Sequence, residues 1–226
     1  MQSVADERPS TSIRGLRCVI VVSAPNVVLR AQLSRPSLAR TLGSANAPLL
    51  SATTVKDAPV EIVPYSSEWP TLFATEAALL LAELSPWLAG EIQHVGSTAV
   101  PGLSAKPVID IMAPIHSLSQ AAPAIEALRS LDYCYFPYQP TEMLWFCKPS
   151  PAHRTHHLHL VPISSRLWAQ RLAFRDALRR EPALLTEYEQ IKVSLAAKHV
   201  HDREAYTEAK TPFIQSVLQK VTASAA

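Results

Sequence analysis

Cysteine, glycine and long apolar runs are scarce in this chain of 226 residues. Its three cysteines, Cys18, Cys134 and Cys147, form neither a disulfide framework nor a CxxC pair. We therefore expect them to be small buried hydrophobic residues in a reducing compartment, the cytoplasm. The chain has no run of about 18 apolar residues, so no membrane span is expected.

A strong excess of charge of either sign is also absent. The formal net charge is +2, which gives no strong argument for a nucleic-acid partner or a membrane surface. The hydrophobic content of 48% is ordinary for a globular protein. The length suits one domain with a tail, or two very small domains. The oligomeric state is left open.

Residues 1–57 differ from the rest of the chain. They are rich in serine and arginine, and no acidic residue lies between Arg8 and Lys56. The apolar run 18–22 is too short to span a bilayer. We expect a disordered N-terminal extension outside the fold. Organelle targeting is an alternative, because Arg-rich, Ser-rich and acid-poor segments are typical of transit peptides.

Residues 58–222 have the pattern of one folded domain. The predicted strands are 60–64, 91–95, 108–113, 133–136, 143–147 and 155–161. The predicted helices are 67–85, 117–131, 166–180 and two segments that begin near 182 and 202. This order indicates an α/β (α+β) domain with a mixed β-sheet flanked by helices and a helical C-terminal part.

Capping and breaking residues mark several helix ends. Ser67 is expected to cap the first helix, and Ser117 or Ser119 the second, because a side-chain oxygen accepts from unpaired N–H groups there. Asp202 is expected to cap the last helical segment. Pro212 should break or restart that segment.

The stretch 94–111 carries two of the five glycines, Gly96 and Gly102. Their spacing of six, with Leu103 following, excludes a P-loop, and the stretch is not GxGxxG either. A Gly-Ser turn at a strand end can still hold phosphate oxygens through backbone N–H groups. Side-chain donors beside it are Ser97, Thr98 and Lys106. The alternative is a tight turn with ordinary hydrogen bonds.

Asp110 stands inside an apolar strand, where a carboxylate is costly unless it is paired or binds a cation. A divalent cation such as Mg²⁺ would compensate for its burial. The alternative is a pair with Lys106 or Arg154, or hydrogen bonds from the backbone.

Three histidines follow Arg154 within five residues. His157 and His159 point to one side of a strand, and His156 points to the other with Leu158. With Asp110 the first two form a candidate two-His, one-carboxylate metal set. His94, just before the Gly-Ser turn, either faces the same cleft or braces the loop.

Lys210 falls on or beside an apolar stripe with Tyr206 and Phe213. It either extends its ammonium group to solvent or reaches the phosphate site as a cation. Arg175 and Asp176 are expected to be an exposed pair or an interhelical bridge.

Several long motifs resemble the GrpB family. They are VEIVPY (60–65) with Trp69-Pro70, HVGSTAVPGL (94–103) with 105–107, IDI (109–111), RTHHLH (154–159), FRD (174–176) and DREAYTEAK (202–210) with 212–214. The resemblance covers about residues 59–221 and implies a nucleotidyltransferase-like fold. The same domain occurs fused to dephospho-coenzyme A kinases, where it is described as an accessory to folding.

The resemblance also implies roles for particular residues. The nucleotidyltransferase Gly-Ser turn corresponds to Gly96 and Ser97, and the first metal-binding carboxylate to Asp110. The second carboxylate position falls at Met112, which cannot bind Mg²⁺. The third falls where His157 or His159 stands. Ordinary two-metal transfer needs carboxylates that clamp both ions, and Met112 removes one of them.

Two functions remain open at this point. The first is a metal-dependent nucleotidyl- or phosphoryl-transferase acting on a nucleotide or another phosphorylated small molecule. Mg²⁺ or Mn²⁺ would be its ion ahead of Zn²⁺, bound by Asp110, His157 and His159. Its substrate phosphates would be held or neutralised by His94, Gly96, Ser97, Thr98, Lys106, Arg154 and Lys210. The second is a non-catalytic ligand-binding or folding-accessory domain that assists a partner such as a dephospho-coenzyme A kinase.

Overall fold

A computed structural model describes residues 59–224. The expected disordered or targeting extension, residues 1–57, lies outside this part. Among the residues described, no helix is long and apolar enough to cross a membrane.

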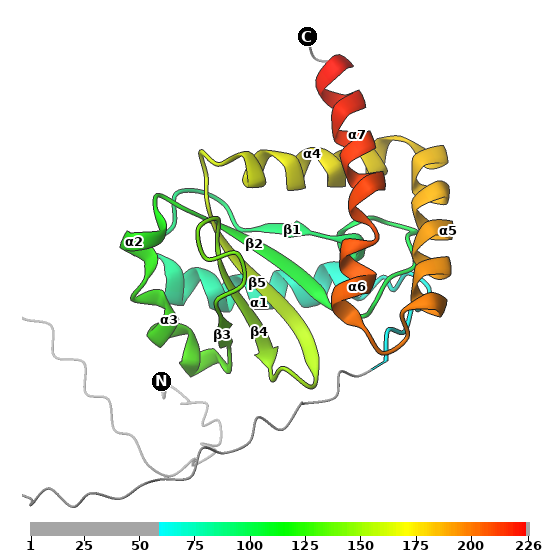
Figure 1. The fold of residues 1–226 in the computed structure, drawn as a ribbon. Coiled ribbons are helices and arrows are strands. Elements are labelled where there is room, and N and C mark those ends of the chain that lie inside the picture. Colours follow the sequence, from blue (N-terminus) through cyan, green and yellow to red (C-terminus); the bar gives the residue numbers. More distant parts are fainter. Residues whose placement is uncertain (1–58, 225–226) are drawn as a thin grey trace, which may run out of the picture. The chain divides into compact units, whose positions relative to one another are not determined.

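The centre of the fold is a five-stranded sheet in the order β1-β2-β5-β4-β3 (Figure 1). Its strands are β1 (Gln93–Val95), β2 (Ile109–Ile115), β3 (Cys134–Phe136), β4 (Leu144–Pro149) and β5 (Arg154–Pro162). β2 and β5 are parallel, and the other neighbours are antiparallel. This confirms the predicted mixed sheet and places the apolar 108–113 run inside it.

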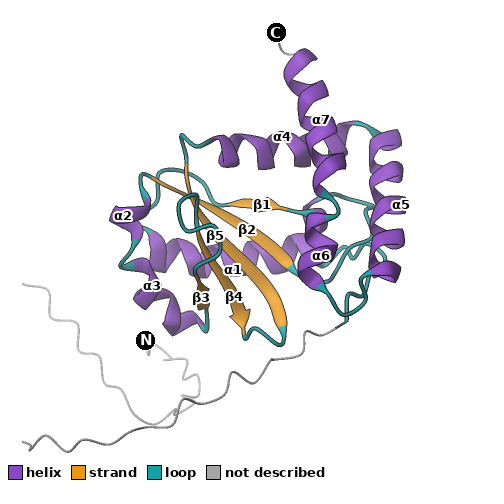
Figure 2. Ribbon diagram, in the orientation of Figure 1, coloured by secondary structure: helices purple, strands orange, loops and turns teal. Residues whose placement is uncertain are grey.

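Helices flank the sheet and form the C-terminal part, as the sequence predicts (Figure 2). The α-helices are α1 (Trp69–Leu84), α2 (Leu118–Ala121), α3 (Ala124–Ala127), α4 (Arg166–Arg180), α5 (Pro182–Lys198), α6 (Arg203–Glu208) and α7 (Thr211–Ser224). Short 3-10 turns are η1 (Ser97–Ala99) and η2 (Leu128–Leu131).

The two faces of the sheet have different cores. On one face, Leu80 and Leu84 of α1 pack with Ile111 and Leu158. This cluster continues under α2 and α3. It has more buried members than any other hydrophobic cluster among residues 59–224, and burial of such surface is the main force that stabilises a fold.

On the opposite face, Val95, Met112 and Val161 pack against Leu167 and Leu172 of α4. Because side chains alternate along a strand, Asp110 and Met112 share this face, and so do His157 and His159. The apolar cluster fills only part of the space between the sheet and the C-terminal helices. The polar side chains line the rest of this space.

The predicted strand 60–64 is wrong. Val63 forms a single antiparallel bridge with Ala105 and no named strand. Pro64 follows directly and has no N–H to continue a ladder.

The predicted helix 117–131 is interrupted. Ser117 caps α2 by accepting from the Gln120 N–H, as expected. The helix α2 ends at Ala121, and α3 begins after Pro123, which is its N-cap residue. Proline has no N–H to continue the helical ladder, so one helix becomes two short ones and η2.

Other helix ends give mixed results. Ser67 does not cap α1, whose N-cap residue is Glu68 without a side-chain cap, and the Glu68 N–H instead donates to Ser66 Oγ at 3.2 Å. Asp202 caps α6 by accepting from the Ala205 N–H. Pro212 lies in the first turn of α7, where the missing N–H is tolerated, so the helix restarts there.

Candidate functional site

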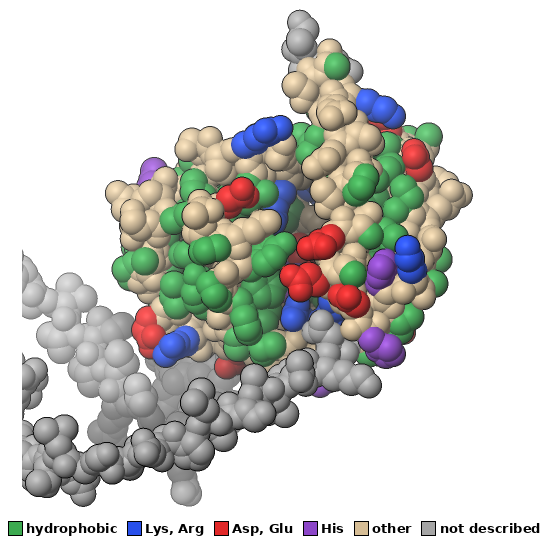
Figure 3. Space-filling model, in the orientation of Figure 1, with side chains coloured by type: hydrophobic (Ala, Val, Ile, Leu, Met, Phe, Trp, Pro, Cys, Tyr) green, Lys and Arg blue, Asp and Glu red, His purple; other side chains and the backbone are tan. Residues whose placement is uncertain are grey.

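A cleft of about 740 Å³ lies between the second face of the sheet and the C-terminal helices. In Figure 3, acidic and basic side chains gather around a hollow on this side, next to a hydrophobic surface. Nine of the ten site residues expected from the sequence line the cleft: Gly96, Ser97, Thr98, Lys106, Asp110, Arg154, His157, His159 and Lys210. The tenth, His94, lies behind the loop.

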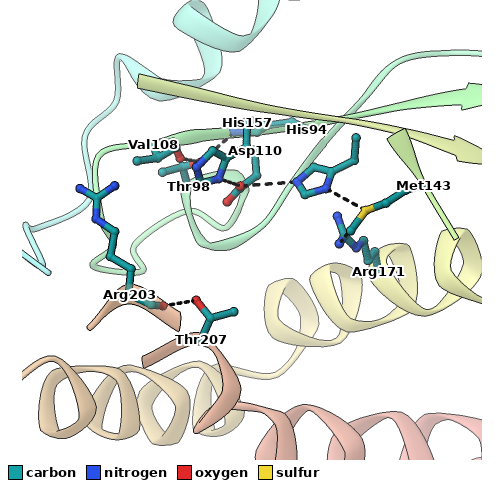
Figure 4. A network of polar contacts seen from close by, with 10 residues as sticks. His94, Thr98, Val108, Asp110, Met143, His157, Arg171, Arg203 and Thr207 are labelled. Atoms are coloured by element: carbon teal, nitrogen blue, oxygen red, sulfur yellow. Dashed lines mark hydrogen bonds and ion pairs between the residues drawn. The ribbon is translucent and has the colours of Figure 1, made fainter. Parts of the chain in front are cut away.

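Strand register brings Asp110 and His157 together. They are direct neighbours in the parallel pair β2–β5, and Nδ1 of His157 lies 2.9 Å from Oδ1 of Asp110 (Figure 4). Nε2 of His159 lies 3.9 Å from the same oxygen. The predicted convergence of the three side chains is therefore present in the structure.

The electrostatics of this cluster favour an ionised Asp110 and a neutral His159. Burial alone would raise the pKa of Asp110, but the hydrogen bonds and charges of His157 and His159 hold it well below its usual range. Burial, assisted by the charge of Arg171, lowers the pKa of His159 to about 3. A neutral imidazole keeps a lone pair for a cation.

His157 has one ring nitrogen left over. Nδ1 faces Asp110, while Nε2 is buried and has no hydrogen-bond partner among residues 59–224. Trp145 packs beside the ring at 5.2 Å between centroids. A buried polar atom without a partner is costly, so Nε2 is a candidate contact for a ligand or metal.

Gly96 is in contact with the Asp110 side chain. It has φ +72°, and a Cβ built there would overlap the Asp110 carboxylate. The turn thus requires glycine for two reasons, its backbone conformation and the space taken by Asp110.

His94 braces the loop and does not face the cleft. Its Nε2 pairs with Thr98 Oγ1 at 3.1 Å, and this hydroxyl donates to the Val108 carbonyl at 3.2 Å. The ring stacks on Phe73. Burial lowers the pKa of His94 to about 4, so it is neutral at pH 7. The Thr98 hydroxyl is also engaged within the protein.

Arginines of α4 hold the same loop from the other side. Arg175 donates to Gln93 Oε1 and to the His94 carbonyl, each at 3.0 Å, while it pairs with Asp176. Arg179 donates twice to the Ala99 carbonyl. Arg175 and Asp176 are thus a pair within one helix, and the expected exposed pair or interhelical bridge is wrong, because the Arg175 side chain is only 11% exposed and connects α4 to β1.

Two lysines meet at one aromatic ring. The ammonium groups of Lys106 and Lys210 lie 5.0 Å and 4.3 Å from the centroid of the Tyr206 ring. Burial lowers the pKa of Lys210 to about 7, and the charge of Lys106 acts in the same direction. Lys210 therefore lies in the cleft wall as a partly desolvated cation.

The far end of the loop is fixed by α5. The buried ammonium group of Lys192 donates to the Ser104 carbonyl, and the Ser104 N–H donates to Glu189 Oε1 at 3.0 Å. Burial raises the pKa of Tyr188, while a hydrogen bond with Ser97 opposes this. The phosphate-loop candidate is therefore held along its whole length.

The sequence reasoning missed Arg171 and Trp145, which both line the cleft. Arg171 Nη2 lies 3.8 Å from Met143 Sδ, a weak acceptor for a guanidinium group. The guanidinium of Arg154 lies over the Trp145 ring at 5.6 Å. One signal for Arg171 was available, because it precedes Arg175 and Arg179 at intervals of four on one helix face.

Met112 lies where the resemblance places a second carboxylate. It is fully buried and packs with Val95, Met143 and Val161. Its surroundings are apolar, so this strand position offers no second acidic ligand.

Asp110, His157 and His159 fit a metal-binding set. Each offers one ligand atom, and these atoms lie within 4.8 Å of one another. One carboxylate and two imidazoles suit Mn²⁺ or Zn²⁺, whereas Mg²⁺ prefers oxygen ligands.

Comparisons with known proteins agree on one family. The family model described as GrpB protein matches residues 59–220. A UPF0157 protein of Pseudomonas aeruginosa is 38% identical over 174 residues, which covers 73% of this chain and 69% of that protein. The glutamate-rich protein GrpB of Alkalihalophilus pseudofirmus is 31% identical over 167 residues, covering 72% of this chain and 95% of that protein.

A solved structure and a longer protein extend the comparison. The crystal structure of conserved protein GrpB from Enterococcus faecalis has a TM-score of 0.66 and 28% identity, with 73% of this chain and 98% of that chain covered. A dephospho-CoA kinase of Mycolicibacterium paratuberculosis is 27% identical over 198 residues, covering 76% of this chain and 48% of that protein.

Proposed function

The chain belongs to the GrpB family, and we propose that its cleft binds a nucleotide or another phosphorylated small molecule together with a divalent metal ion, for nucleotidyl or phosphoryl transfer. The observation that carries this proposal is the pair Lys106 and Lys210 on the Tyr206 ring, in the same cleft as the Asp110 cluster.

Two ammonium groups against one ring repel each other, and burial adds a desolvation cost for Lys210. An anion bound near both ammonium groups offsets these effects and raises the pKa of Lys210 toward its ordinary value. Arg154 and Arg171 line the same cleft and add positive charge. Clusters of lysine and arginine commonly bind phosphate groups through charge-assisted hydrogen bonds.

Asp110, His157 and His159 would hold the metal ion. When bound, such an ion acts as a Lewis acid that neutralises charge on phosphoryl oxygens. The protein's own residues orient the substrate: the Gly96–Ser97 turn lies against Asp110, and the lysines and arginines balance charge that develops on the transferred group. The donor atoms favour Mn²⁺ over Mg²⁺.

A second candidate function is a non-catalytic binding domain. Met112 favours it, because two-metal transfer requires a second carboxylate that this buried apolar position does not supply. A domain of this kind binds the ligand without turning it over.

The test measures thermal unfolding of the full chain with ATP, ADP or pyrophosphate, each with Mn²⁺, Mg²⁺ or Zn²⁺. A ligand at about 100 times its Kd stabilises a protein by about 2.7 kcal/mol, which this assay resolves. We expect stabilisation that is lost in Asp110→Asn and Lys210→Met and kept in Lys198→Met, an exposed lysine on α5. No stabilisation by any combination overturns the proposal.

A second measurement separates the two functions. ³¹P NMR follows ATP with Mn²⁺ and the protein, alone and with hydroxyl- and amine-bearing acceptors. New phosphorus signals that vanish in Asp110→Asn support transfer. Binding with unchanged ATP supports the non-catalytic domain.

A further inference from the structure

The row of side chains that contains Asp110 continues across the sheet into two cysteines. Asp110 on β2 lies directly opposite His157 on β5. His157 in turn lies opposite Cys147 on β4, and Cys147 lies opposite Cys134 on β3. Direct partners in adjacent strands point to the same face. The two thiols are therefore on the cleft face of the sheet, one and two strands beyond His157.

The backbone geometry of the two cysteines suits a disulfide. Directly opposed residues of an antiparallel pair have Cα atoms about 4.5–5.5 Å apart, and disulfides span about 4.4–6.8 Å between Cα atoms. Both cysteines are free thiols, and Cys134 Sγ lies 3.6 Å from the Pro149 carbonyl.

The two thiols differ in access. Cys134 is half-buried and therefore within reach of a small oxidant, whereas Cys147 is fully buried. Burial raises the pKa of Cys147 despite the opposing charge of Arg154. Because a peroxide reaches the more accessible sulfur first, Cys134 is the first thiol to react and Cys147 the second.

We propose that Cys134 and Cys147 form an oxidation site, in which a peroxide converts the dithiol to a cross-strand disulfide beside the candidate functional site. The Cys134 thiolate attacks one peroxide oxygen, the O–O bond breaks, and the leaving hydroxide takes the thiol proton as water. The Cys147 sulfur then displaces water from the resulting sulfenic acid as its own proton is transferred. Two thiols and one hydrogen peroxide give one disulfide and two waters.

The disulfide alters the surroundings of His157. Cys147 is the direct cross-strand neighbour of His157, and the new bond draws its side chain toward β3. This changes the packing that holds Nδ1 of His157 on Asp110, so ligand binding in the cleft weakens. The weakening rests on the proposed function, whereas formation of the bond does not.

The test treats the reduced full chain with hydrogen peroxide, blocks remaining thiols with N-ethylmaleimide and measures the mass. Trypsin does not cut between Lys148 and Pro149, so both cysteines fall in the peptide 130–154, while Cys18 falls in another. We expect this peptide to lose two hydrogen atoms and to take up no N-ethylmaleimide. Cys18→Ser should behave in the same way, and Cys134→Ser and Cys147→Ser should not form the bond.

Three results overturn the oxidation site: two alkylated thiols in peptide 130–154 after peroxide, a bond to Cys18, or a bond between chains.

A second experiment tests whether the disulfide weakens ligand binding, and it compares the affinity for ADP with Mn²⁺ before and after oxidation. We expect it to fall at least about fivefold, the lower end of coupling between linked sites, and to recover with dithiothreitol. Unchanged affinity in a chain that carries the bond overturns the coupling. If the reduced chain binds no nucleotide, the proposed function fails while the mass measurement still decides on the bond.

Discussion

Gly96 and Asp110 are packed so closely that the loop and the carboxylate fix each other's position. The Asp110 Cβ would lie 2.9 Å from a Cβ on Gly96, and the carboxylate would be closer still. This contact ties the shape of the Gly-Ser turn to the acid that the resemblance makes the metal ligand. A change at the turn should therefore affect stability and ligand binding together.

Gly96→Ala tests this contact against a matched glycine. Gly102 has a similar φ of +80°, but a Cβ there has nothing within 4 Å. Both variants bear the cost of a positive φ, about 1–3 kcal/mol, and Gly96 with ψ −171° lies in a region that essentially only glycine adopts. We expect Gly96→Ala to lower the free energy of unfolding by about 1–3 kcal/mol more than Gly102→Ala does, because the loop or Asp110 must move. Urea unfolding measures the difference, and equal losses would show that the contact is unimportant.

The ion pair between Glu76 and Lys148, on the α1 face of the sheet, should stabilise the fold more than an exposed ion pair does. Lys148 donates to both carboxylate oxygens of Glu76 at 2.9 and 3.0 Å, and Glu76 is 5% exposed. Glu76→Gln should lower the free energy of unfolding by about 2–3 kcal/mol, because it leaves a half-buried lysine without its counter-charge. The control is Glu126→Gln, which breaks a bridge to Arg129 between side chains that are 76% and 69% exposed. It should change the free energy of unfolding by less than about 0.5 kcal/mol.

His94 predicts a dependence of stability on pH. Its pKa is about 4 in the folded protein, against about 6.5 in the unfolded chain. Between pH 4 and 6.5 the unfolded chain therefore binds more protons than the folded protein. The contribution of His94 to the free energy of unfolding is complete above about pH 6.5 and falls as the pH drops toward 4. His159, whose pKa is about 3, acts in the same direction.

The measurement is urea unfolding at pH 7 and pH 5. From pH 7 to pH 5, the free energy of unfolding should fall by roughly 2 kcal/mol less in His94→Gln than in the unsubstituted chain. An unchanged pH dependence in the variant would mean that His94 is already neutral in the unfolded chain or charged in the folded one.

The contact between Lys192 and Ser104 predicts that the loop around Ser104 depends on α5 for its stability. Lys192→Met leaves the Ser104 carbonyl without its ammonium donor and should cost about 1–3 kcal/mol. Hydrogen exchange should rise at residues 103–105 before it rises in β2. Lys198→Met, at an exposed position of the same helix, should have neither effect.

Arg171 predicts a loss of ligand binding with little loss of stability. Met143 Sδ is a weak acceptor, and the attraction of Arg171 to Asp110 is outweighed by the desolvation of its buried guanidinium group, so Arg171→Met gives up little within the protein. We expect weaker binding of pyrophosphate with Mn²⁺ at unchanged unfolding free energy, measured by isothermal calorimetry. Arg166→Met, at the start of the same helix, is the control.

The site's first elements were predictable because they follow local rules. Alternation along a strand put His157 and His159 on one face, and the costly carboxylate in an apolar run identified Asp110. Their meeting required only that the two strands be neighbours, which β2 and β5 are. Asp202 and Ser117 were found by the same local capping rule.

The remaining features depend on tertiary geometry that local patterns do not specify. Arg171 and Trp145 reach the cleft because of how α4 crosses the sheet and where β4 pairs. The role of His94 could not be decided, since both of its alternatives begin at the same turn. The break at Pro123 was visible in the sequence as a proline inside the predicted helix 117–131, but the prediction rested on the serine cap alone.

The parallel pairing of β2 with β5 has a consequence for how the protein folds. Asp110 meets His157 across 47 residues of chain, and Lys210 joins the same cleft after all five strands have been made. Contacts between distant segments form slowly because a long loop must close first. During synthesis, the strands that carry the acid and the histidines are made before the lysine that faces them. The cleft is therefore complete only when the segment between α6 and α7, which carries Lys210, has docked.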